Sequence, residues 1–160
     1  MTARIPLNNP NPTRIGLLML ILLAGCAAPV KPVAHYDDIL DRSVHQVESQ
    51  TMGQVKRIID TKGEGDGSFQ RSGQFYAEIK GEVQALIVRA EIMEQGLATT
   101  PLTNNFEVLQ LQLDDLSAQQ QKPYDESAFL KMQAAFDKSF RTIVKLIIDM
   151  KWREEAPKEK

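Results

Sequence analysis

Residues 125–153 read D-E-S-A-F-L-K-M-Q-A-A-F-D-K-S-F-R-T-I-V-K-L-I-I-D-M-K-W-R, and this stretch indicates the fold most clearly. Its apolar side chains recur at spacings of three and four residues, which is the period of an amphipathic α-helix. Asp125 suits the N-cap, and Glu126 suits the first turn, where the helix dipole favours an acid. We therefore expect a long helix whose buried face carries Phe129, Met132, Phe136, Phe140, Ile143, Ile147 and Met150.

Three earlier segments have the same periodicity. The first, over residues 37–61, starts with acids and ends before three glycines; its apolar positions are Leu40, Val44, Val47, Thr51, Val55 and Ile58. The second begins between Ser68 and Gln74 and ends near Gln95, just before Gly96; its apolar positions are Phe75, Ile79, Val83, Leu86, Ala90 and Met93.

The third segment ends near Ala118 and has two candidate starts. Thr100 can act as N-cap with Pro101 in the first helical position. Asn104 with Glu107 forms a competing capping box. The apolar positions of this segment are Leu102, Phe106, Leu109, Leu113 and Leu116.

Four helical segments with short connections predict an all-α, antiparallel up-down four-helix bundle. We expect Phe75, Leu86, Leu109, Phe136, Phe140 and Ile147 in its core. The third helix is the shortest, so the ends of the first and fourth should project past it. A helical hairpin that completes its core by dimerising is the alternative, which leaves monomer and dimer both open.

The N-terminal region has the features of an export signal. Arg4 and Arg14 precede an uncharged run, I-G-L-L-M-L-I-L-L-A, over residues 15–24. That run is about half of the roughly 20 residues that a membrane-spanning helix needs. It leads into L-A-G-C at residues 23–26, which closely resembles the lipobox of bacterial lipoproteins.

This resemblance implies cleavage between Gly25 and Cys26 and attachment of lipid to Cys26, the only cysteine. Residues 1–25 would be the signal peptide, 26–36 a lipidated tether spaced by Pro29 and Pro32, 37–153 the bundle and 154–160 a polar tail. Because stable membrane attachment needs more than one acyl chain, the lipidated Cys26 is expected to carry several. Ala27, rather than Asp, after the cysteine implies the periplasmic face of the outer membrane.

Charge and cysteine content argue against nucleic-acid binding, binding to anionic lipid and thiol chemistry. Residues 26–160 carry 17 basic and 21 acidic residues, a net charge of −4. There is no basic excess for nucleic acid and no polybasic stripe for anionic lipid. If Cys26 carries lipid, no thiol remains for a disulfide or a nucleophile.

The sequence offers few candidate ligands or catalytic groups. His45 and Glu48 form an H-x-x-E word that resembles the short motif of imelysin-like helical envelope proteins, some of which are linked to iron. On a helical wheel His45 faces water, so a solvated face is expected and a weak surface metal site is the alternative. The glutamates of residues 74–95 should lie mostly at the edge of the apolar face or outside it, and no E-x-x-H word occurs. We therefore expect no cofactor and no catalytic residues.

Surface apolar residues remain as the functional candidates. Residues 74–95 carry a second apolar stripe that includes Ala85, Val88 and Ile92, and the last helix adds Leu146, Ile148 and Trp152 off its main face. Because each helix of a bundle touches two neighbours, these wide apolar faces are expected mainly to pack in the core, and a partner-binding surface is the alternative. A partner surface would favour a non-enzymatic adaptor, pilotin-like chaperone or structural accessory with an envelope protein partner. A buried, inward-facing His or acid would favour a small-ligand or metal carrier, and an inhibitor or immunity lipoprotein is a third hypothesis.

Overall fold

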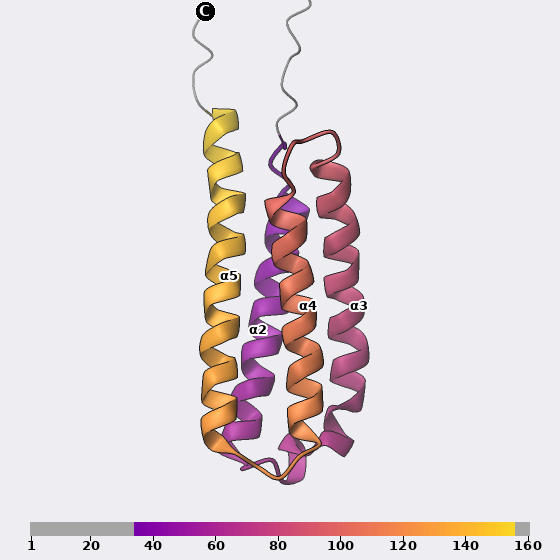
Figure 1. Ribbon diagram of the computed structural model, residues 1–160, viewed down its shortest axis with the longest axis vertical. Coiled ribbons are helices and arrows are strands. Elements are labelled where there is room, and N and C mark those ends of the chain that lie inside the picture. The colour runs from indigo at the N-terminus through magenta and orange to yellow at the C-terminus, as the bar shows by residue number, and fades with distance from the viewer. Residues whose placement is uncertain (1–33, 156–160) are drawn as a thin grey trace, which may run out of the picture. The chain divides into compact units, whose positions relative to one another are not determined.

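The computed structural model describes residues 34–155. Its elements are α2 (Asp38–Asp60), the short 3-10 helix η1 (Gly65–Gly67), α3 (Phe69–Met93), α4 (Pro101–Gln120) and α5 (Glu126–Glu155) (Figure 1). The described range contains no strand. The predicted all-α class is therefore confirmed.

The four long helices form an antiparallel bundle in which successive helices run in opposite directions (Figure 1). Each helix packs against two others: α2 and α4 both lie against α3 and α5. Within residues 34–155, α3 and α5 make no helix–helix contact, so they occupy diagonal corners. They run in the same direction, and their C-terminal ends lie at the same end of the bundle.

Of the two helices predicted to project past α4, only α5 does so. α5 has 30 residues against 20 in α4, a difference of about 15 Å at 1.5 Å per residue. The C-terminal turns of α5 extend past the neighbouring helices (Figure 1). α2 has 23 residues and is barely longer than α4, so the predicted projection of the first helix is wrong.

Five of the six residues predicted for the core are buried. Leu86, Leu109, Phe136, Phe140 and Ile147 are buried as predicted. The exception is at the start of α3, where Phe75 is only half-buried and packs beside the core. The neighbouring Tyr76 takes the buried position. Among the other periodic positions, Met93 and Met132 are only half-buried and pack against the core.

The helix ends show why the segments begin where they do. The Asp37 carboxylate accepts hydrogen bonds from the backbone N–H groups of Ile39 (2.9 Å) and Leu40 (3.1 Å), as an N-cap does. α4 begins at Pro101, the first of its two predicted starts. The α3–α4 turn uses Gly96, whose φ of +80° favours glycine.

The end of the bundle near η1 is closed by a buried polar network. The Gln120 side chain of α4 donates to the Gly67 carbonyl (2.6 Å) and to Ser72 Oγ (2.9 Å) and accepts from the Tyr76 hydroxyl (2.6 Å). Gln54 of α2 donates to Ser72 Oγ at 2.7 Å. Burial raises the pKa of the Tyr76 phenol, which keeps it protonated as a donor. This network joins three helices and the η1 turn.

Chain packing starts slightly before the predicted domain boundary at residue 37. Ala34 is buried against the bundle, and Tyr36 packs beside the core. The last residues of the predicted tether therefore belong to the packed domain. Gly25, Cys26 and the rest of the predicted signal and tether up to residue 33 lie outside the described residues.

Candidate interaction surface

The predicted partner residues are exposed, with one exception. Three residues of α3 face solvent: Ala85, Val88 and Ile92, of which Ile92 is 69% exposed. We call these three residues the α3 patch. On α5, Ile148 is 45% and Trp152 is 72% exposed, and we call this pair the α5 patch. Leu146 is half-buried and packs against the core, so it does not belong to that surface.

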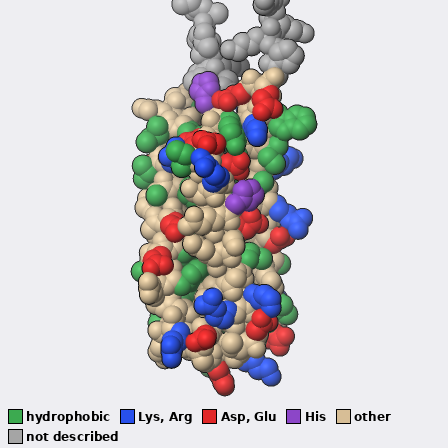
Figure 2. All heavy atoms as spheres, turned by 180° about the vertical axis from the view of Figure 1, so that it is seen from behind, with side chains coloured by type: hydrophobic (Ala, Val, Ile, Leu, Met, Phe, Trp, Pro, Cys, Tyr) green, Lys and Arg blue, Asp and Glu red, His purple; other side chains and the backbone are tan. Residues whose placement is uncertain are grey.

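The structure does not join the two patches into one surface. They lie on the diagonal helices α3 and α5, separated by α2 and α4. Both are close to the C-terminal ends of their helices and therefore lie toward the same end of the bundle. Figure 2 shows the face over α2, where hydrophobic side chains gather toward this end on both sides of a group of charged side chains.

A groove between α2 and α3 lies next to the α3 patch. Its volume is about 330 Å³, and its lining combines apolar positions with a polar rim: Ile39, Ser43, Gln46, Val47, Glu82, Ala85, Leu86 and Arg89. Ile39 is 51% exposed and was not predicted, because it lies just outside the periodic face of α2. Of the eight large hydrophobic side chains that are exposed within residues 34–155, five lie on this end of the bundle: Ile39, Val88, Ile92, Ile148 and Trp152.

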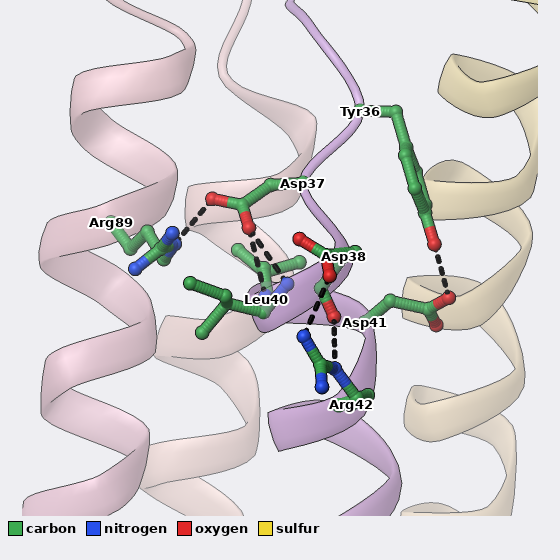
Figure 3. A network of polar contacts seen from close by, with 8 residues as sticks. Tyr36, Asp37, Asp38, Leu40, Asp41, Arg42 and Arg89 are labelled. Carbon is green, nitrogen blue, oxygen red and sulfur yellow. Dashed lines mark hydrogen bonds and ion pairs between the residues drawn. The ribbon is translucent and has the colours of Figure 1, made fainter.

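Residues 35–37, which we call the entry segment, are bonded to three helices. Glu154 of α5 accepts from the Tyr36 backbone N–H at 2.7 Å and contacts His35 Nδ1 at 2.9 Å. The Tyr36 hydroxyl donates to Asp41 of α2 at 2.8 Å, and the Arg89 guanidinium of α3 pairs with Asp37 (Figure 3). The chain therefore reaches α2 through a fixed position between α3 and α5.

The electrostatics of Asp37 follow from these contacts. Partial burial raises the pKa of its carboxyl, but the Arg89 guanidinium and the N–H groups of Leu40 and Ile39 outweigh that effect. The net result is a pKa below the ordinary value. Asp37 is thus a charged cap that also ties α2 to α3 (Figure 3).

The possible metal ligands lie on the surface of α2. The His45 side chain is 57% exposed; its Nδ1 lies 3.3 Å from Glu48 and its Nε2 lies 3.6 Å from Asp41. Each ring nitrogen thus faces a carboxylate. Among residues 34–155, no group of three or more His, Cys, Asp or Glu side chains is arranged to hold a metal ion.

One acid faces inward, contrary to the expectation for this helix. Glu94, at the end of α3, is only 3% exposed. Its carboxylate accepts from the N–H groups of Leu102 (2.8 Å) and Thr103 (2.9 Å) and from the Thr103 hydroxyl (2.7 Å). Glu94 therefore caps the start of α4, where the helix dipole favours a negative charge.

In comparisons with known proteins, no family model, curated sequence or solved structure matched the chain. A search of the described helices for one long and apolar enough to cross a membrane found none. The fold and the surface thus define a class, a four-helix bundle with exposed apolar patches toward one end.

Proposed function

We propose that this protein is a lipoprotein anchored through Cys26 on the periplasmic face of the outer membrane, where it serves as a non-enzymatic adaptor or structural accessory. Its partner would be an envelope protein that docks on the α3 patch and the adjoining α2–α3 groove. The single observation that carries the proposal is the gathering of exposed apolar side chains around this groove at one end of a well-packed bundle. The L-A-G-C word supports the anchor.

The chemistry of the groove fits a helical segment of a partner. Ala85 is small, so a second helix can approach α3 closely there. Val88 and Ile92, three and seven residues further on, lie along the same side of α3 and give the spaced apolar contacts of helix-in-groove recognition. Arg89 and Glu82 supply a charged rim, as protein interfaces have around an apolar centre.

The carrier hypothesis has less support. A buried His or acid would favour it, and the buried acid Glu94 already accepts three hydrogen bonds from the first turn of α4. Within residues 34–155, the buried side-chain atoms without a partner, Thr51 Oγ1 and Gln112 Oε1, are a hydroxyl and an amide oxygen. Stoichiometric metal in the purified protein, lost on His45→Ala substitution, would favour the carrier instead.

Membrane attachment can be tested by Cys26→Ser substitution. We expect loss of acyl labelling and release from the membrane fraction, because serine offers no thiol for attachment of the lipid. Unchanged membrane association of the variant would refute the anchor.

The docking site can be tested by a photo-crosslinking amino acid placed at Ala85. We expect one defined envelope protein to be captured and the capture to be lost on Val88→Ser and Ile92→Ser substitution. Val108→Ser on α4 is the matched control, since Val108 and Val88 are both 46% exposed. Equal loss with the control variant would show that the α3 patch has no special role.

A further inference from the structure

The docking site proposed on α3 does not include the α5 patch. Trp152 and Ile148 lie one turn apart on the same side of α5, and both are exposed. They lie in about the last two turns of α5, near its C-terminal end. They do not line the α2–α3 groove, and α5 is not a neighbour of α3.

We propose that the α5 patch contacts the surface of the lipid bilayer, with the indole of Trp152 at the level of the lipid headgroups. This inference rests on the proposed anchor at Cys26. Tryptophan has an apolar ring body and one N–H donor, and it is enriched where proteins meet the membrane–water interface. Ile148 adds apolar surface one turn away.

The number of residues between Cys26 and the bundle limits how far the anchor can lie from this end of α5. Cys26 precedes Ala34 by eight positions, and a fully extended chain of about 3.6 Å per residue then spans roughly 29 Å at most. His35 and Tyr36 are bonded to Glu154, two residues from Trp152. The lipid-bearing chain thus arrives beside the same turns that carry the α5 patch.

The net charge of the last turns of α5 indicates whether the contact depends on the charge of the lipid headgroups or on apolar burial. Residues 145–155 carry equal numbers of opposite charges: Lys145, Lys151 and Arg153 against Asp149, Glu154 and Glu155. A neutral segment gains little from anionic headgroups, whose attraction depends on clustered Lys and Arg. The contact should therefore be hydrophobic and should form equally on zwitterionic and anionic membranes.

Tryptophan fluorescence reports on this contact directly, because Trp152 is the only tryptophan in the chain. Lipidated protein is purified from membranes and reconstituted into phosphatidylcholine vesicles with or without bromine on the acyl chains. We expect emission at shorter wavelength than for the soluble Cys26→Ser protein, and quenching by the brominated lipid. Vesicles that contain phosphatidylglycerol should give the same quenching.

The matched control moves the fluorophore along the same helix. Leu130 is 48% exposed near the other end of α5, 22 residues or about 33 Å from Trp152. In a Trp152→Phe, Leu130→Trp double variant, the brominated lipid should not quench the emission.

The outcomes separate the two proposals. Protein that fails to float with vesicles would refute the anchor and the contact together. Protein that floats while Trp152 is unquenched would refute the contact alone and leave the anchor in place. A shift to shorter wavelength without quenching would mean that another protein surface, such as a second copy, covers Trp152, and it would also overturn the lipid contact. Quenching only with phosphatidylglycerol would refute the hydrophobic mode.

Discussion

The two ends of the bundle differ in how much apolar surface they expose. At the η1 end, polar side chains point inward and bond to each other: Gln120 alone bonds to Gly67, Ser72 and Tyr76. At the end where the chain enters, Glu94 is also buried and bonded to the first turn of α4. The contacts of the entry segment, however, lie at or near the surface, and the large apolar side chains of Ile92 and Trp152 are exposed. Both ends thus hold bonded polar side chains inside, but five of the eight exposed large hydrophobic side chains within residues 34–155 lie at the entry end.

This difference separates residues that stabilise the bundle from residues of the proposed docking surface. Buried hydrogen-bond networks stabilise and fix one arrangement, because any lost partner leaves a buried group unpaired. Exposed apolar patches add little to stability and mark sites where another surface can bind. Substitutions at the two ends should therefore have different consequences.

The largest effect should come from the core that both ends share. Phe136 is fully buried on α5, and Phe136→Ala should lower the free energy of unfolding by about 3–5 kcal/mol, since it removes a ring and leaves a cavity. Denaturant titration followed by circular dichroism measures this loss. A loss under about 1 kcal/mol would contradict the burial of this face.

At the η1 end, Gln120→Ala should cost about 2–3 kcal/mol. The Tyr76 hydroxyl and the Gly67 carbonyl would both lose a buried partner. Gln121→Ala is the control, because Gln121 is the exposed neighbour and should change stability little. Equal effects of the two variants in thermal unfolding would show that the network does not close this end.

At the entry end, Asp37→Ala should cost about 1 kcal/mol at neutral pH through loss of the N-cap. The pKa of Asp37 is lowered in the folded state, so its stabilisation is present above the ordinary carboxyl pKa and is lost as the pH falls. The wild-type protein should thus lose more stability than Asp37→Asn when the pH falls from about 5 to about 3. This range extends about one unit to either side of the ordinary carboxyl pKa of about 3.9. Parallel pH curves for the two proteins would contradict this role.

The smallest effect on stability should come from the α5 patch. Ile148→Ser and Trp152→Ala should each change the free energy of unfolding by less than about 0.5 kcal/mol, as exposed substitutions usually do. The crosslink from Ala85 to a partner should persist in both variants. A strongly lowered melting temperature would place these residues in the core and remove the contrast between the ends.

The sequence predicted the parts of the fold that depend on local signals. Apolar spacing and capping residues located all four helices, and the boundary of α4 at Pro101 was one of two predicted starts. These features act within a few residues along the chain, so they can be read without knowledge of the tertiary structure.

Features that depend on distant partners were not predictable. Tyr76 rather than Phe75 is buried because its hydroxyl reaches Gln120, 44 residues away in sequence. Glu94 points inward because the N–H groups that begin α4 need an acceptor. At the candidate surface, the exposure of Val88, Ile92, Ile148 and Trp152 followed the helical wheel, but the diagonal placement of α3 and α5 required the helix packing.

The entry segment also has a mechanical consequence. A pull on the chain before Ala34 first loads the bonds of Tyr36 and His35 to Glu154 and the pair between Asp37 and Arg89. Force applied to the entry segment thus acts on α5 and α3 as well as on the first turn of α2. Tension therefore passes across one end of the bundle, and the opposite end, with its buried network, stays out of the path of the force.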